Sequence, residues 1–229
     1  MPKKKIENEQ GKTTSVISSG WLETRKYRLT GLTPILGSQP ASEAIRTQFV
    51  SSKARESVLT EEVRALFAAE QSQSAGVTVF PRDPDNDDCI ILLDYMIRGF
   101  FKSALSAMNA HIGISASKSK VDKYLFVSPR RIPLTRDGEL IYDEDSYFER
   151  PLRAETMRGP RVSLVSSECI DAPWQIEIEI KVVFNSATAK SRALNWEVVE
   201  TALDYGQLSG HGQFRNGSYG TFAWERIDG

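Results

Sequence analysis

The residues with the greatest potential for binding chemistry form a glycine-rich segment near the end of the chain, residues 210–220. Glycines let a backbone approach a ligand closely, and the N–H groups of such concave loops bind anions. The segment follows a predicted helix and precedes a predicted strand, whereas the dinucleotide-binding motif follows a strand and opens a helix. The alternative is that these glycines only allow tight packing. The expected ligand contacts are Gly210, Gly212, Arg215, Asn216, Gly217 and Tyr219.

A basic region lies between residues 98 and 161, which hold 12 Lys and Arg against 8 Asp and Glu, although the whole chain has a net charge of −1. A neutral chain with one basic region is typical of a protein that binds phosphates along a groove. Arginine suits phosphate because its guanidinium is planar and offers several donors. The alternative is that these side chains merely solvate the surface. The candidate phosphate contacts are Arg98, Lys102, Arg150, Arg153, Arg158 and Arg161.

The chain has two histidines, His111 and His211. A general acid–base pair would require them to lie close together. His111 follows an ordinary amphipathic stretch, His211 lies between two glycines, and the chain lacks the nucleophile-elbow motif of a Ser-His-Asp triad. We therefore expect no catalytic residue. The alternative is a metal-independent endoribonuclease that uses His111 or His211.

The residue types also argue against a metal or a cofactor. Two cysteines, Cys89 and Cys169, are too few for a disulfide framework or for a metal site of their own. The acidic loop at residues 83–88 matches a calcium loop only in part, because that motif needs Gly at its sixth position and Glu at its twelfth. Asp88 and Asp94 occupy those positions. We expect a solvated loop, with neither metal nor cofactor.

The 229 residues are 40% apolar and 26% charged, which is close to the globular average and excludes a coiled coil or wholesale disorder. No apolar run approaches the ~20 residues of a membrane span. The basic start at residues 3–5 lacks the apolar stretch of a secretory signal. We expect a cytoplasmic protein without membrane contact, with a flexible tail at residues 1–20 and a single domain at residues 21–229.

The elements that must position these residues follow a recognisable order. Residues 174–184 alternate apolar and polar side chains, which predicts a strand with one buried face. Once two insertions are set aside, the order is β-α-β-β-α-β, which predicts an α+β fold with a ferredoxin-like core, as in RRM domains. The predicted core elements are residues 24–31, 95–110, 124–127, 174–184, 190–205 and 219–227.

Two large insertions decorate this core. The first, at about residues 36–90, is predicted to be helical, with helices over residues 42–54 and from residue 60 onward. The second, at residues 128–170, is predicted to be a β-ribbon arm, and Asp137-Gly138 marks a hairpin turn within it.

The sequence also predicts three local features in and around the first core helix. Asp94 is predicted to cap the helix that follows it, and residues 115–123 are predicted to form a Ser/Lys-rich link. Gly99 lies in mid-helix, where glycine costs about 1 kcal/mol against Ala. Close approach of another backbone would explain it.

Three segments resemble the repeat-associated mysterious protein (RAMP) superfamily, which consists of CRISPR-associated RNA-binding proteins with ferredoxin-like domains. Residues 29–38 are similar to the turn after the first strand of its backbone subunits, and residues 97–105 are similar to the opening of their first helix. The glycine-rich loop within residues 206–227 has the family's placement, between the second helix and the last strand. The resemblance covers the core but not the insertions.

The resemblance implies a backbone-type subunit of a class 1 CRISPR effector complex, used in antiviral defence. Such a subunit would bind a single-stranded guide RNA along its backbone, and would assemble head to tail with copies of itself or with other effector subunits. Residues 128–170 would form its thumb-like hairpin.

Some members of the superfamily cut RNA with an Asp in the loop soon after the first strand. Residues 37–42 contain no Asp, and the first acid is Glu43. This difference argues against cleavage. A further hypothesis is a structural or interaction protein that keeps the fold without nucleic-acid binding.

Overall fold

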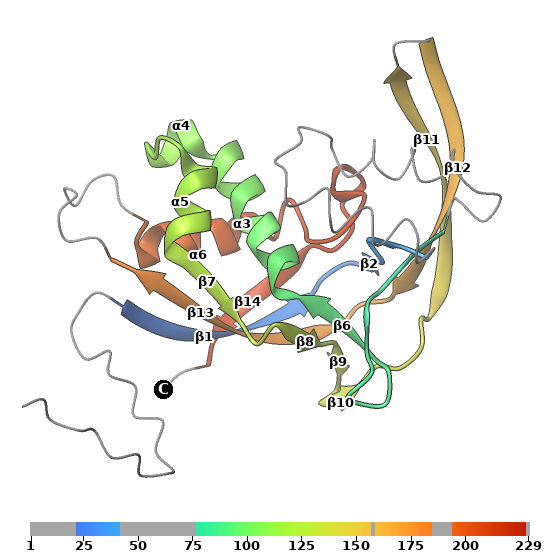
Figure 1. Cartoon of the computed structure of the whole chain (residues 1–229), viewed down its shortest axis with the longest axis horizontal. Coiled ribbons are helices and arrows are strands. Elements are labelled where there is room, and N and C mark those ends of the chain that lie inside the picture. Colours follow the sequence, from blue (N-terminus) through green and yellow to red (C-terminus); the bar gives the residue numbers. More distant parts are fainter. Residues whose placement is uncertain (1–21, 42–76, 157–158, 185–193, 228–229) are drawn as a thin grey trace, which may run out of the picture.

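A computed structural model describes residues 22–41, 77–156, 159–184 and 194–227 (Figure 1). The predicted tail at residues 1–20, the predicted helix at residues 42–54 and the start of the helix predicted from residue 60 lie outside these ranges.

The central sheet confirms the predicted α+β fold with a ferredoxin-like core. Its strands run in the order β14-β1-β13-β7, and each neighbouring pair is antiparallel. One helix follows the first core strand and the other follows the third, which is the β-α-β-β-α-β order. In chain order the six elements are β1 (Leu22–Gly31), α3 (Asp94–Ala107), β7 (Leu125–Ser128), β13 (Gln175–Val183), α6 (Trp196–Tyr205) and β14 (Phe222–Arg226).

The helices cover one face of this sheet (Figure 1). The other face carries charged residues. The isoleucines of β13 point to the helices and are buried, as the alternation predicted. On the opposite face, Arg28 lies in register with Glu177 and Glu225 and forms ion pairs with both at 2.8 Å. The two faces of the sheet therefore divide into a core side and a polar side.

The described parts of the first insertion are short strands, and the helices predicted within it lie outside the described residues. These are β2 (Ile35–Leu36), β3 (Gln39–Pro40), β4 (Val77–Val79), β5 (Arg82–Asp83) and β6 (Cys89–Leu93). Strand β6 runs directly into α3 and pairs with β8 (Arg131–Pro133) of the second insertion. The pairing of β6 with β8 therefore joins the first insertion to the second.

The second insertion contains the predicted β-ribbon arm. Strands β11 (Ser146–Thr156) and β12 (Gly159–Ile170) pair along their whole length, and the ribbon extends away from the core (Figure 1). Before it, β9 (Thr135–Arg136) pairs with β10 (Glu139–Leu140). Asp137 and Gly138 both have positive φ, as a two-residue hairpin turn requires, so the predicted turn is confirmed.

Several predicted details are wrong. Asp94 is the first residue of α3 and not its cap, because Leu93 holds the N-cap position and makes no side-chain cap bond. The expected link at residues 115–123 contains α5 (Ser117–Tyr124), which follows the short α4 (Asn109–Ile112). Helix α5 has a polar sequence and was not predicted, because Val121 is the one apolar residue that it buries fully.

Helix α6 also begins later than predicted, at Trp196, with Asn195 as its N-cap. The Asn195 side chain accepts a hydrogen bond from the backbone N–H of Val198 at 2.9 Å, which satisfies a free donor of the first turn. None of the helices among the described residues is long and apolar enough to cross a membrane.

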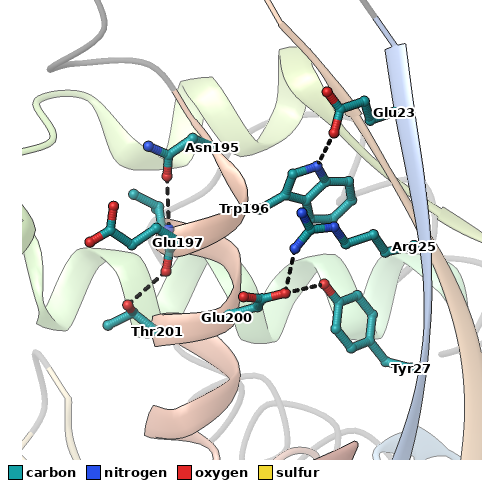
Figure 2. A network of polar contacts seen from close by, with 9 residues as sticks. Glu23, Arg25, Tyr27, Asn195, Trp196, Glu197, Glu200 and Thr201 are labelled. Atoms are coloured by element: carbon teal, nitrogen blue, oxygen red, sulfur yellow. Dashed lines mark hydrogen bonds and ion pairs between the residues drawn. The ribbon is translucent and has the colours of Figure 1, made fainter. Parts of the chain in front are cut away.

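A polar network fixes α6 to β1 (Figure 2). Glu200 accepts hydrogen bonds from the Tyr27 hydroxyl at 2.9 Å and from Arg25 at 2.6 Å. The Arg25 guanidinium lies 4.4 Å from the ring centroid of Trp196, whose indole N–H donates to Glu23 at 2.7 Å. Burial and the neighbouring Glu200 carboxylate raise the pKa of Tyr27 well above its usual value, so the phenol stays protonated.

We predict that Glu200→Ala lowers the free energy of unfolding by about 2 kcal/mol, because it leaves the buried Tyr27 hydroxyl without an acceptor. Urea denaturation measures the loss. Glu197→Ala, an exposed acid on the same helix, is the control and should cost less than about 1 kcal/mol. Equal losses in the two variants would contradict a special role for the network.

Candidate nucleic-acid interface

The segment after β1 and the glycine-rich loop are joined side by side. The Thr33 hydroxyl donates to the backbone carbonyl of Ser218 at 2.8 Å and accepts from the N–H of Thr221 at 3.0 Å. The indole N–H of Trp174 donates to the Thr33 carbonyl at 2.9 Å, and Gly220 N–H donates to the Pro34 carbonyl at 2.7 Å. These bonds hold the loop against the end of the first strand.

The glycines of the loop are explained by its own packing. A Cβ on Gly210 would lie 2.1 Å from the backbone of Gly220, and one on Gly220 would lie 1.9 Å from the carbonyl oxygen of His211. Gly212 has a φ of +88°, and a Cβ on Gly217 would collide with the ring of Phe214. The alternative reading from sequence, tight packing, therefore accounts for all four glycines without a ligand.

A hollow of about 70 Å³ opens between this loop, the segment after β1 and the first turns of α3. It brings together parts of the three segments that carry the family resemblance. This volume can hold a few waters or a small polar group of a larger ligand. The lining residues are Ser38, Tyr95, Met96, Gly99, Phe100, His211, Gly212 and Arg215.

Gly99 is a glycine that the described part of the fold does not explain. No described atom lies within 4 Å of the position that its Cβ would occupy, so the predicted backbone contact is absent from the described part of the chain. Its backbone is helical, unlike Gly113 and Gly138, which also have open surroundings but positive φ. A helix interior therefore carries a glycine whose open side lines the hollow.

His211 lies in the hollow with an unusual environment. It is 4% exposed, and its Nε2 has no hydrogen-bond partner among the described residues. Burial, together with the positive charge of Arg215, lowers the pKa of the imidazole from about 6.5 to about 3. The ring is therefore neutral at physiological pH.

The other histidine lies at the opposite end of α3. His111 is exposed on α4, beyond the C-terminus of a 14-residue helix that spans about 21 Å. The hollow lies at the N-terminal end of that helix. The two histidines are therefore not placed to act as an acid–base pair.

Arg150 connects the arm to the glycine-rich loop. It is 5% exposed and donates to Gln213 at 2.6 Å and to the Ser167 hydroxyl at 3.0 Å. Its guanidinium also lies 5.0 Å from the ring centroid of Phe214. Sequence reasoning treated Arg150 as a surface phosphate contact, because the Gln213 partner is 63 residues away and leaves no local pattern.

Aromatic rings gather at the same junction. Phe148 of β11 lies 4.7 Å from Tyr219 and 6.0 Å from Phe214, measured between ring centroids. All three are partly exposed, so one side of the cluster is available to a ligand. Phe222, by contrast, is fully buried in the core.

The other candidate basic residues divide into three groups. Arg98 makes a long ion pair with Asp94 at 3.9 Å, and Lys102 pairs with Asp122 of α5 at 2.6 Å. At the tip of the loop, Arg215 begins the 3₁₀ turn η1 (Arg215–Gly217), and Asn216 and Gly217 are exposed. The side chains of Arg153, Arg158 and Arg161 lie outside the part of the chain that the structure describes.

No family model matches the chain, and no curated protein matches it. One similar solved structure is a chain from a cryo-EM structure of the Type III-B Cmr-beta bound to cognate target RNA. The similarity covers 91% of this chain and 61% of that one, at 10% sequence identity and a TM-score of 0.45. This chain thus spans less than two thirds of that neighbour. A likeness of this size supplies no premise about function.

We predict that His211 makes the protein less stable in mild acid. The pKa of this imidazole is near 3 when folded and near 6.5 when unfolded, so between these values only the unfolded chain binds the proton. The resulting loss is on the order of 1 kcal/mol per pH unit below about pH 6.5, and is absent above it.

Denaturation of the wild type and His211→Phe from pH 7 to pH 5 measures this effect. The wild type should lose stability more steeply than His211→Phe, whereas His111→Phe should follow the wild type. Parallel pH profiles for the wild type and His211→Phe would contradict the buried, neutral imidazole.

Proposed function

We propose that this protein binds single-stranded RNA along its sugar–phosphate backbone without cleaving it. The binding site is the hollow between α3 and the glycine-rich loop, with the aromatic junction and the arm beside it. The observation that carries this proposal is Gly99. A glycine that costs about 1 kcal/mol in a helix, and has no described atom near the place of its missing side chain, is explained if a ligand backbone passes there.

Charge supports a phosphate ligand at this place. Arg215 lines the hollow itself, and Arg98 precedes Gly99 on the same helix. Guanidinium groups bind phosphates through several parallel hydrogen bonds. Two such groups beside Gly99, which has no side chain, therefore suit a sugar–phosphate backbone. The partly exposed rings of Phe148, Phe214 and Tyr219 offer bases a stacking surface that tolerates any sequence.

The histidines support binding rather than cleavage. His211 is buried, and His111 is separated from it by the length of α3, so the two are not placed to act as an acid–base pair. Neither the described geometry nor the absence of Asp from residues 37–42 favours an endoribonuclease.

Assembly is the second part of the proposal. The resemblance to the RAMP superfamily implies that copies of the chain, or other effector subunits, follow one RNA strand head to tail. The arm offers a surface for such contacts, because Val162 and Leu164 of β12 are 68% and 63% exposed. Size-exclusion chromatography with RNA strands of increasing length tests it, since each further length increment should add one protomer. A fixed stoichiometry of one would contradict assembly while leaving RNA binding intact.

We predict that Gly99→Ala separates stability from binding. The methyl group should raise the free energy of unfolding by about 0.5–1 kcal/mol, because alanine is the better helix former. The same methyl enters the ligand's space at a cost of about 1–3 kcal/mol, which is at least roughly fivefold in Kd. Ser106→Ala, an exposed position of α3, is the control, with a small gain in stability and unchanged Kd. Tight RNA binding by Gly99→Ala would place the ligand elsewhere.

We also predict that RNA affinity falls steeply with salt and depends little on sequence. Each neutralised phosphate contributes about −0.7 to the slope of log affinity against log salt on single strands, so four to six contacts give roughly −3 to −4. Changing both Arg98 and Arg215 to Gln should flatten the slope by about 1 to 1.5. Arg28→Gln, on the polar face of the sheet, is the control and should leave it unchanged. A wild-type slope near zero would favour an interaction protein that does not bind nucleic acid.

A further inference from the structure

The glycine-rich loop holds Phe214 in a strained conformation. Phe214 has a φ of +54°, which lies in the left-handed region that bulky residues rarely adopt. A Cβ on Gly217 would lie 2.3 Å from the Phe214 ring, so the loop also omits a side chain to make room for it. Phe214 nevertheless stays partly exposed, whereas Phe222 is fully buried. Strained residues gather at ligand sites, which makes this ring a candidate ligand contact.

The Phe214 ring belongs to a cluster of three rings. Phe214 and Tyr219 come from the loop and Phe148 comes from β11, and their ring centroids are 4.7, 5.7 and 6.0 Å apart. Rings at these distances are in contact, so a flat ligand has no room between them and stacks on the outer side of the cluster. The flat group of a single-stranded nucleic acid is an unpaired base.

Arg150 fixes the inner side of this cluster. One of its terminal nitrogens donates to the Ser167 hydroxyl of β12, and the other donates to Gln213 of the loop. The guanidinium carbon lies 5.0 Å from the ring centroid of Phe214 and 5.8 Å from that of Phe148. Burial of a charged group costs free energy that an apolar side chain of the same size would not. What the arginine adds is direction, because its planar fork holds two elements in one orientation.

We propose that the outer side of the Phe148, Phe214 and Tyr219 rings binds one unpaired base of the RNA strand, and that Arg150 is the positioning residue that holds these rings for the base. This rests on the proposed function and adds to it a base subsite beside the hollow. Arg215 follows Phe214 in the loop and lines the hollow, so the phosphate contacts and the rings are neighbouring parts of one site.

The test compares two short RNA strands. The first has a sugar–phosphate backbone without bases, and the second is the same strand with a single 2-aminopurine at its centre, whose fluorescence is quenched when it stacks. Wild-type protein should bind the second strand at least roughly fivefold more tightly, as one stacked base implies, and should quench its fluorescence.

Three variants test the role of Arg150. Arg150→Lys keeps the charge but loses the planar fork, so it should bind both strands with the affinity of wild type for the base-free strand, and without quenching. Gln213→Leu removes the hydrogen bond from the loop side and should give the same result, also where Arg150→Lys does not fold. Arg82→Lys makes the matched change at a partly buried arginine that pairs with Glu144 and Glu168, and it should retain the preference.

The outcomes separate this inference from the proposed function. Wild type that binds both strands equally overturns the base subsite while backbone binding stands, and this comparison needs no variant to fold. A preference and quenching that persist in Arg150→Lys or Gln213→Leu overturn the positioning role, even if both strands bind more weakly. Wild type that binds neither strand overturns the proposed function itself. Loss of preference and quenching in the Arg150 and Gln213 variants, but not in Arg82→Lys, supports the inference.

Discussion

The binding side of the molecule depends on the hydroxyl of Thr33. This one group bonds to Ser218 and Thr221, which lie 185 and 188 residues further along the chain, and so joins the segment after β1 to the loop before β14, the neighbouring strand of the central sheet. The contact brings backbone against backbone, and the glycines of the loop are the residues that permit it. The position of the loop therefore determines the floor of the hollow, the orientation of His211 and the position of the base of the arm.

The same hollow contains two departures from what stability alone would select. A glycine interrupts a good helix at Gly99, and an imidazole nitrogen is buried without a partner at His211. Elsewhere in the described core, apolar side chains fill the space and the polar groups of Figure 2 are paired. In natural proteins, local sequence preferences agree with the overall fold, and the exceptions occur mainly at functional sites. Two such exceptions within one small hollow are therefore stronger evidence for a functional site than either alone.

Local patterns in the sequence were sufficient for the core and insufficient for the site. The alternation in β13 and the Asp137-Gly138 turn are properties of neighbouring residues, and both were predicted correctly. Helix α5 was missed, because a single buried valine gives no periodic pattern. The buried state of Arg150 and of His211 depends on partners and packing far along the chain, for which no short-range signal exists. Gly99 was noticeable as a misfit, but only the structure shows that no described atom lies within 4 Å of the position of its missing Cβ.

Strand β12 is part of both the arm and the main body of the protein. This determines how the distance to which the arm extends from the body can change. Its last residues pair with β4 and β2, whereas residues 159–165 pair, among the described strands, with β11 alone. Side chains alternate with a period of two, so adding or removing two residues on each strand keeps every other side chain on its face. Each such step alters the reach by about 7 Å and leaves the junction at Arg150 untouched. The spacing that the arm imposes on whatever it contacts is thus adjustable in discrete steps, independently of the hollow.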